Sequence, residues 1–158
     1  MCCFPLALFL FVDLQKAFDT VGHEILLKKL DHYGIREGPL NLLQSYLTDR
    51  KQCVSVRGTL SSYKTIQHGV PQGSILGPLL FLVYINDLNK AIKNSKTFHF
   101  ADDIGLLCCD KSLKSLNRMV NQNLSALANW LRANEISLNT KKLKLSFSED
   151  VANKSTKT

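Results

Sequence analysis

The stretch that decides the fold is Phe98-His99-Phe100-Ala101-Asp102-Asp103-Ile104-Gly105-Leu106-Leu107. Two apolar runs of strand-like composition flank two adjacent carboxylates, which predicts a β-hairpin with Asp102 and Asp103 at its tip. An Asp-Asp pair at a turn is by default a solvated turn. Because both flanks are too apolar for a surface segment, the acids are expected at the edge of a buried region, where Mg²⁺ would offset their repulsion. The hairpin alone leaves the solvated turn and the metal site both open.

A third carboxylate follows a comparable strand near the start of the chain. Residues 8–13 are Leu-Phe-Leu-Phe-Val-Asp, a continuous apolar run typical of a buried strand that ends in Asp13. An aspartate after a strand often caps the next turn. Since Asp13 leaves its strand as Asp102 does, the sequence favours one site shared by the acids.

Length and composition are those of a single globular domain. The 158 residues are enough to bury a core, and 45% hydrophobic residues with only 4 prolines and 8 glycines exclude a disordered or fibrous chain. The 20 basic and 13 acidic residues give a formal charge of +7, which favours a polyanionic partner.

The cysteines and the apolar N-terminus bear on the compartment. The five cysteines lack zinc-ligand spacing and the density of a disulfide framework, so reduced, buried thiols are expected at Cys2, Cys3, Cys53, Cys108 and Cys109. Residues 1–12 resemble a signal-peptide core but lack a positive n-region and a small-residue cleavage site. No run reaches the about 20 apolar residues that span a bilayer. We expect an intracellular protein, nuclear or cytoplasmic, that is neither secreted nor membrane-bound.

The other elements alternate between helical and strand-like patterns. Apolar residues at three- and four-residue steps predict helices over residues 23–33, 39–48, 78–92 and 112–134, the third largely buried. Strands are also expected over 52–58, paired with 63–67 across a turn near 58–62, and over 136–138 and 143–147. Helices against an antiparallel sheet give an α+β fold, close to a split β-α-β, ferredoxin-like layer with helices packed on one face.

Four sequence segments follow one another along the chain. They are Phe11-Val12-Asp13-Leu14-Gln15-Lys16-Ala17-Phe18-Asp19, then Gly69-Val70-Pro71-Gln72-Gly73-Ser74-Ile75-Leu76-Gly77-Pro78, then Tyr84-Ile85-Asn86-Asp87-Leu88, and then Phe100-Ala101-Asp102-Asp103. Together they resemble the palm domain of reverse transcriptases, specifically those of non-LTR, LINE-type (jockey-like) retrotransposons. The likeness covers residues 8–147, which leaves residues 1–7 as an unmatched start and 148–158 as a polar tail.

By this resemblance Asp13, Asp102 and Asp103 hold two Mg²⁺ ions, with Mn²⁺ as an alternative. Such polymerases join a 3′-hydroxyl to the α-phosphate of a nucleotide while pyrophosphate leaves. Two ions roughly 3.5 to 4 Å apart stabilise the attacking and departing oxygens together. The implied activity is RNA-directed DNA polymerisation, a nucleotidyl transfer.

The resemblance also implies roles for four further residues. Phe18 matches the aromatic position under the sugar of the incoming nucleotide, where it would exclude a 2′-hydroxyl; from periodicity alone it is a core phenylalanine. Gln72 and Gly73 match a rigid loop that lines the nucleotide pocket, although a lone glycine-rich loop can be only an ordered connection. Lys142 matches a lysine proposed to protonate the leaving pyrophosphate, and it could equally be a solvated lysine at a strand end.

The implied partners are an RNA template, a DNA primer and deoxynucleoside triphosphates. Family members carry fingers before the palm and a thumb after it, neither of which is expected within this chain, so we expect weak or absent polymerisation by it alone. One alternative is a catalytically inactive remnant that at most binds nucleic acid through its basic surface. A nucleotide cyclase would share the two-metal chemistry, and only family likeness speaks against it.

Overall fold

The computed structural model describes residues 6–100 and 102–149, so Cys2, Cys3, Ala101 and most of the predicted polar tail lie outside the described residues. The chain forms two compact units. The sheet unit comprises the residues up to Gln15 together with those from Asn86 onward, and the helical unit comprises Lys16–Ile85. No helix in the described ranges is both long and apolar enough to cross a bilayer.

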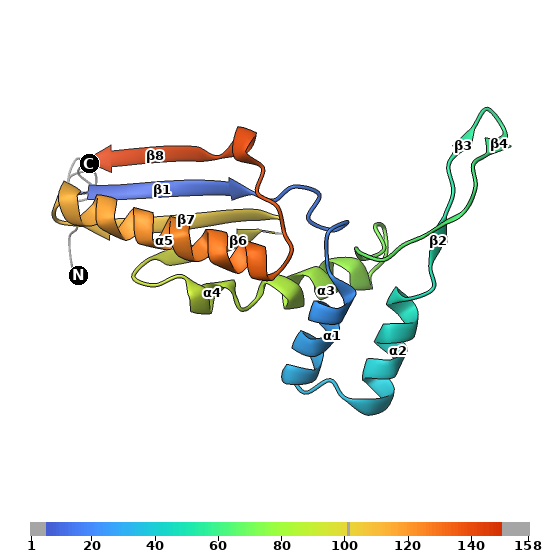
Figure 1. The fold of residues 1–158 in the computed structure, drawn as a ribbon. Helices are drawn as coiled ribbons and strands as arrows, with labels where there is room; N and C mark the ends of the chain where they lie inside the picture. The colour runs from blue at the N-terminus through green and yellow to red at the C-terminus, as the bar shows by residue number, and fades with distance from the viewer. Residues whose placement is uncertain (1–5, 101, 150–158) are drawn as a thin grey trace, which may run out of the picture. The chain divides into compact units, whose positions relative to one another are not determined.

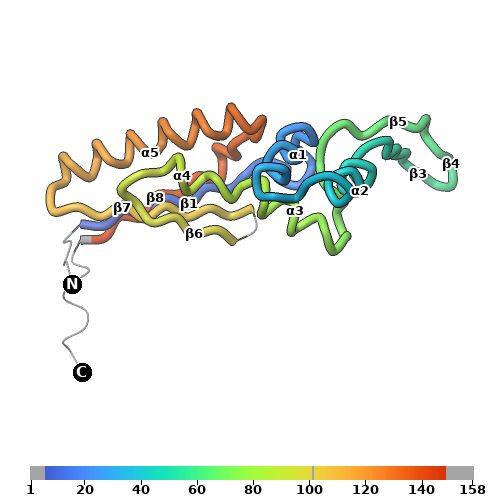
Figure 2. The backbone as a smooth tube through the Cα atoms, turned by 90° about the horizontal axis from the view of Figure 1, so that it is seen from below, coloured from blue at the N-terminus to red at the C-terminus, as the bar shows by residue number. Residues whose placement is uncertain are grey.

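The sheet unit is built on four antiparallel strands in the order β6-β7-β1-β8. These strands are β1 (Leu6–Asp13), β6 (Lys96–Phe100), β7 (Asp103–Asp110) and β8 (Lys144–Glu149). The long helix α5 (Leu113–Ala133) runs across one face of the sheet (Figures 1 and 2), and the short helix α4 (Leu88–Ala91) contacts α5. This arrangement confirms the predicted α+β layer.

The covered face of the sheet holds the core of this unit. Alternate side chains of a strand point to opposite faces, so Leu10 and Val12 of β1 and Ile104 and Leu106 of β7 are all buried. Residue Phe11 is 49% exposed, so β1 forms as predicted but is buried on one face only and not throughout. The reason is that a helix covers only one face.

The apolar stripe predicted for α5 packs on this covered face. Leu116 and Val120 form a buried cluster with Cys108 of β7, and Leu6 and Leu8 of β1 pack against it. Burial raises the pKa of the Cys108 thiol. Cys108, Cys53 and Cys109 form no disulfide, as expected, but Cys53 and Cys109 are only half-buried.

The helical unit contains three helices and a narrow hairpin. The helices are α1 (His23–His32), α2 (Glu37–Leu47) and α3 (Leu76–Ile85), and α1 contacts both of the others. Leu26 and Leu30 of α1 are buried, as are Phe81 and Tyr84 of α3. The Gly22 amide donates to the Tyr84 hydroxyl at 3.2 Å, so the start of α1 is fixed to α3.

The predicted helix 78–92 is in fact two helices. Helix α3 begins at Leu76 and ends at Ile85, and α4 starts at Leu88. Asp87 lies at the break and accepts a hydrogen bond from Trp130 Nε1 at 3.2 Å, so its side chain serves a tertiary contact. The expectation of a largely buried helix is wrong for one face, where Leu79 and Leu82 are 56% and 46% exposed.

Two further strand predictions need correction. The ladder expected between 52–58 and 63–67 divides into β2 (Lys51–Gln52) with β5 (Lys64–Thr65), and β3 (Ser55–Val56) with β4 (Thr59–Leu60). Its turn is Arg57-Gly58, both at positive φ, which suits a two-residue hairpin loop. Residues 136–138 form no strand; Leu138 makes a single bridge to Leu14, because β8 takes the place beside β1.

Candidate functional site

The three predicted acids lie at one end of the sheet. Asp13 ends β1 and is the register partner of Asp103, the first residue of β7. Directly opposite residues of an antiparallel pair project from the same face. Asp102 occupies the turn before β7, and all three acids line one cavity of about 760 Å³. Within the described ranges, no group of three or more His, Cys, Asp or Glu side chains is arranged so that it could hold a metal ion.

Both carboxylate oxygens of Asp13 are engaged. Lys142 Nζ lies 3.1 Å from Oδ1, and Asn139 Nδ2 donates to Oδ2 at 2.8 Å. The Asp13 side chain is only 15% exposed, whereas that of Lys142 is 65% exposed. The ammonium group of Lys142 therefore contacts the same carboxylate that is predicted to hold a metal ion.

Asn139 belongs to this site although no sequence pattern assigned it a role there. Besides its side-chain bond, its backbone amide donates to the Asp13 carbonyl at 2.9 Å. The short turn η1 (Thr140–Lys142) then brings Lys142 back to the same acid. The only signal in the sequence was the Asn-x-x-Lys spacing, which links Asn139 to Lys142 and says nothing of Asp13.

Phenylalanine side chains lie next to the acids on the face of the sheet opposite α5. The rings of Phe9 and Phe98 stack at 5.9 Å, and Phe9 and Phe11 lie 4.4 Å apart. A Cβ on Gly105 would lie 2.6 Å from the Phe9 ring, so the ring occupies space that only glycine leaves free. Phe100 is 83% exposed. This cavity thus joins acids, aromatic rings, Lys142 and Lys144.

His99 borders the same cavity on β6. Its Nε2 lies 2.7 Å from Asn89 Oδ1, and its Nδ1 is buried without a partner among the described residues. Burial lowers the pKa of His99, which favours the neutral imidazole. His99 consequently adds no permanent charge to this cavity near neutral pH.

The other predicted site residues belong to the helical unit. Phe18 is half-buried with its ring 4.9 Å from that of Phe81. Gln72 Nε2 donates to Asp19 Oδ1 at 2.7 Å. Gly73 adopts φ +78°, a conformation that favours glycine. The positions of Phe18 and Gln72 are therefore explained by contacts within the helical unit, and that of Gly73 by its backbone conformation.

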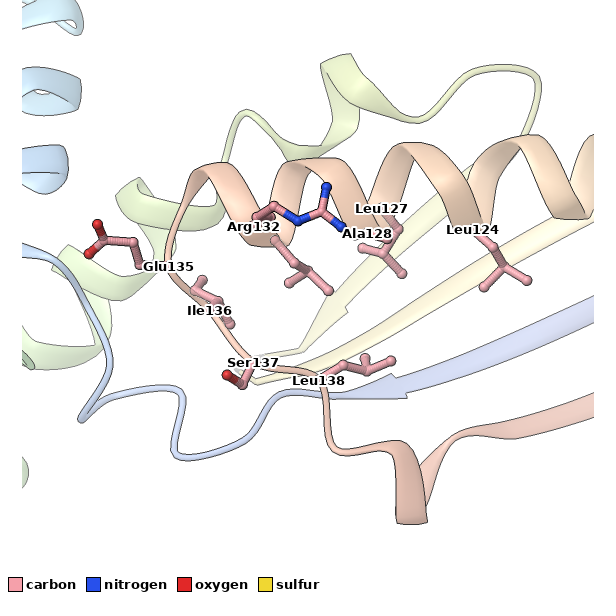
Figure 3. Close-up of a pocket in the computed structure, with 9 residues that line it drawn as sticks. Leu124, Leu127, Ala128, Arg132, Glu135, Ile136, Ser137 and Leu138 are labelled. Carbon is pink, nitrogen blue, oxygen red and sulfur yellow. The ribbon is translucent and has the colours of Figure 1, made fainter.

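A second cavity of the sheet unit contains none of the predicted site residues. It measures about 490 Å³ and lies between α5 and residues 135–138 (Figure 3). Leu124, Leu127 and Leu138 contribute to its mainly aliphatic lining, and Arg132 and Glu135 are the charged residues there. The lining of this second cavity offers no cluster of oxygen ligands. The end of the sheet that carries the three acids is therefore the better candidate for a metal site.

Residues 6–157 match the family described as reverse transcriptase (RNA-dependent DNA polymerase). The chain belongs to this family. It is 35% identical over 153 residues to a probable RNA-directed DNA polymerase from transposon BS, and 33% identical over 139 residues to the RNA-directed DNA polymerase from mobile element jockey, both of Drosophila melanogaster. Each alignment covers 84% of this chain and 15% of the relative, so this reverse transcriptase chain spans about 15% of their length.

The fold comparison agrees with the family. An apo telomerase of Candida tropicalis, truncated from its C-terminal domain, superposes with a TM-score of 0.68 at 16% identity and covers 94% of this chain and 32% of its own. The expected reverse transcriptase family and palm-type polymerase fold are both confirmed. The roles of the individual site residues stay predictions.

Proposed function

We propose that this chain is the palm of an RNA-directed DNA polymerase of a non-LTR retrotransposon, with Asp13, Asp102 and Asp103 as ligands of two Mg²⁺ ions. The proposal rests above all on the pairing of Asp13 with Asp103 at the end of two adjacent strands, with Asp102 lining the same cavity. Carboxylate oxygens are the ligands that Mg²⁺ prefers. When bound, the ions would activate the primer hydroxyl and stabilise the leaving pyrophosphate.

The residues around Asp13 fit a cation. The ammonium of Lys142 contacts Oδ1, where a metal ion would compete with it, and Asn139 holds Oδ2. Displacement of Lys142 from Asp13 would leave its proton available to the leaving pyrophosphate, the role implied by the family. Asn139 would keep the carboxylate plane in one orientation throughout.

The uncovered face of the sheet suits nucleic acid. Phe98 and Phe100 are 50% and 83% exposed, and Lys142 and Lys144 border the same cavity. Bases stack on aromatic rings and phosphates are attracted by lysines. An RNA template and a DNA primer are therefore the proposed partners, with deoxynucleoside triphosphates as the substrate.

The second candidate is a catalytically silent palm that binds nucleic acid only through its net charge of +7. The observation in its favour is that Lys142 already neutralises Asp13. Extension of a DNA primer on an RNA template, with deoxynucleotides and Mg²⁺, separates the two. We expect weak incorporation by this chain alone, and this incorporation should stop when EDTA removes the metal. Template binding without any incorporation, in Mg²⁺ or Mn²⁺, would contradict the polymerase.

Sugar selection tests the proposed place of Phe18 at the nucleotide. We expect Phe18→Val to raise the relative kcat/KM for ribonucleotides about 10- to 100-fold, because the smaller side chain leaves room for a 2′-hydroxyl. The measurement is single-nucleotide incorporation with matched ribo- and deoxynucleotides. Phe147→Val, an exposed position on β8, is the control. Unchanged discrimination in an active Phe18→Val protein would rule out this role.

Metal dependence tests Asn139. We expect Asn139→Ala to lower the incorporation rate or the apparent Mg²⁺ affinity about 10- to 100-fold, the usual cost of losing a group that orients a metal ligand. A Mg²⁺ titration of the initial rate measures both effects. The matched control is Asn121→Ala, whose side chain donates to the Asn117 carbonyl on the exposed face of α5. Identical Mg²⁺ titrations for the two variants would show that Asn139 does not position Asp13.

A further inference from the structure

His99 lies one residue before the end of β6, next to the turn that carries Asp102. Its imidazole Nε2 is 2.7 Å from Asn89 Oδ1 on helix α4. An amide oxygen only accepts hydrogen bonds, so His99 Nε2 carries a proton and donates. We propose that His99, held by Asn89, is a positioning residue that fixes the end of β6 and thereby the place of Asp102. This inference rests on the proposed function, in which Asp102 binds a metal ion.

Strand β6 lies at an edge of the four-stranded sheet. It has five residues, and among the described strands it pairs with β7 alone, where Phe100 is the register partner of Asp103. A strand held by a single ladder opens more easily than an inner strand. The turn with Asp102 follows this end of β6, so a shift of the strand moves Asp102 relative to Asp13 on the inner strand β1.

Two side chains of β6 donate to the same oxygen of α4. Thr97 and His99 are alternate residues and therefore share a face of the strand. Their register partners, Leu106 and Ile104, are both buried. The Thr97 hydroxyl also donates to Asn89 Oδ1. One acceptor on α4 thus holds β6 at two positions on the same face.

Helix α4 is itself fixed within the sheet unit. Leu88, the neighbour of Asn89, is fully buried, and α4 contacts α5. Directly before α4, Asp87 accepts a hydrogen bond from Trp130 Nε1 of α5 at 3.2 Å. A continuous series of contacts therefore runs from the long helix α5 through α4 to the end of β6.

The second ring nitrogen indicates why a histidine stands at this position. His99 Nδ1 is buried and has no hydrogen-bond partner among the described residues. Burial of an unpaired polar atom is unfavourable, and an apolar side chain of similar size would avoid that cost. The interaction that only a polar side chain supplies here is the Nε2 hydrogen bond to Asn89.

The test compares His99→Leu with His99→Gln. Leucine removes the donor, whereas the amide Nε2 of glutamine can donate to Asn89 from a similar place. The readouts are hydrogen–deuterium exchange of residues 96–104 without metal, and kcat and KM of primer extension across a Mg²⁺ series. We expect His99→Leu to speed exchange and to lower kcat or the apparent Mg²⁺ affinity, each about tenfold, without a change in KM for the template–primer. His99→Gln should stay within about threefold of the unmodified chain.

Asn89→Ala is the reciprocal variant, at an exposed position of α4. It should cause about the same loss as His99→Leu, and the double variant should lose no more, because both changes remove one contact. His32→Leu, at an exposed position of α1, is the control and should stay within about twofold of the unmodified chain. Additive losses, equal losses in His99→Leu and His99→Gln, or no loss in His99→Leu would overturn the proposal.

Exchange needs neither metal nor nucleotide, so it separates this inference from the proposed function. A chain that never extends a primer, but whose exchange rises in His99→Leu and not in His99→Gln, would contradict the polymerase and support the contact. A polymerase whose exchange and rate are the same in His99→Leu would do the reverse. Circular dichroism checks folding, and if His99→Leu does not fold, Asn89→Ala and His99→Gln decide.

Discussion

Replacing Asp102 by asparagine is expected to abolish RNA-templated incorporation, a loss on the order of 10³-fold or more, because a neutral amide cannot replace a carboxylate that would hold a divalent cation. Asp102 stands in the turn that leads into β7 and borders the same cavity as Asp13. The measurement is the initial rate of primer extension across a Mg²⁺ series. A variant with an unchanged rate would contradict the metal assignment.

The matched control for this change is Asp110→Asn, at the opposite end of the same strand. The carboxylate of Asp110 accepts the Ser112 amide at 3.1 Å and the Ser115 hydroxyl at 2.8 Å, next to the start of α5. The Ser115 and Ser112 hydrogen bonds lower the pKa of Asp110. This carboxylate therefore binds the N-terminal end of α5 and not the proposed metal site. We expect incorporation within about twofold of the unmodified chain, since the site keeps all its ligands.

A thermal shift gives a readout of the acids that is independent of polymerisation. A ligand that binds only the folded state raises its stability with concentration. Mg²⁺ should therefore raise the melting temperature of the unmodified chain and of Asp110→Asn, but not that of Asp102→Asn. No shift in any of the three proteins, together with no incorporation, would favour the catalytically silent palm.

Replacing Gly69 by alanine is expected to destabilise the helical unit by about 2 to 5 kcal/mol, the sum of left-handed strain and overpacking. Gly69 has φ +88°, and a Cβ there would lie 2.9 Å from both the Cα and the carbonyl oxygen of Asp19. Those are backbone atoms, which cannot rotate away as a side chain would. The close approach is maintained by the Gly69 amide, which donates to the Val21 carbonyl, and by His23 Nε2, 2.8 Å from the Gly69 carbonyl.

Urea unfolding followed by circular dichroism measures this loss. Gly58→Ala is the matched control, because Gly58 has φ +83° but open space where a Cβ would lie. We expect about 1 to 2 kcal/mol for the control, from backbone strain alone. Similar losses in the two variants would show that the contact between Gly69 and Asp19 contributes nothing of its own.

Local pattern was sufficient for much of the fold and for the identity of the acids. Helix α5 and helix α1 follow from apolar residues at helical spacing. Asp102 lies in the turn between two strands as expected, whereas Asp103, expected beside it at the tip, is already the first residue of β7. Local sequence patterns do not predict contacts between segments that are far apart in the chain. Asn139 bonds to an acid 126 residues away, and Asp87, at the break between α3 and α4, accepts a hydrogen bond from Trp130, 43 residues further on.

The sequence by itself determined the order and chemistry of the parts: three acids that each follow an apolar strand, a long amphipathic helix, and a basic chain with the segments of a reverse transcriptase palm. Only the tertiary structure decided which groups lie next to the acids: the register that pairs Asp13 with Asp103, and the contacts of Asn139 and Lys142 with Asp13. The physical reason is that hydrophobic periodicity acts within a few residues and specifies which face of an element is buried. Hydrogen bonds and charge pairs between elements depend on packing, which brings together residues that are far apart in the chain.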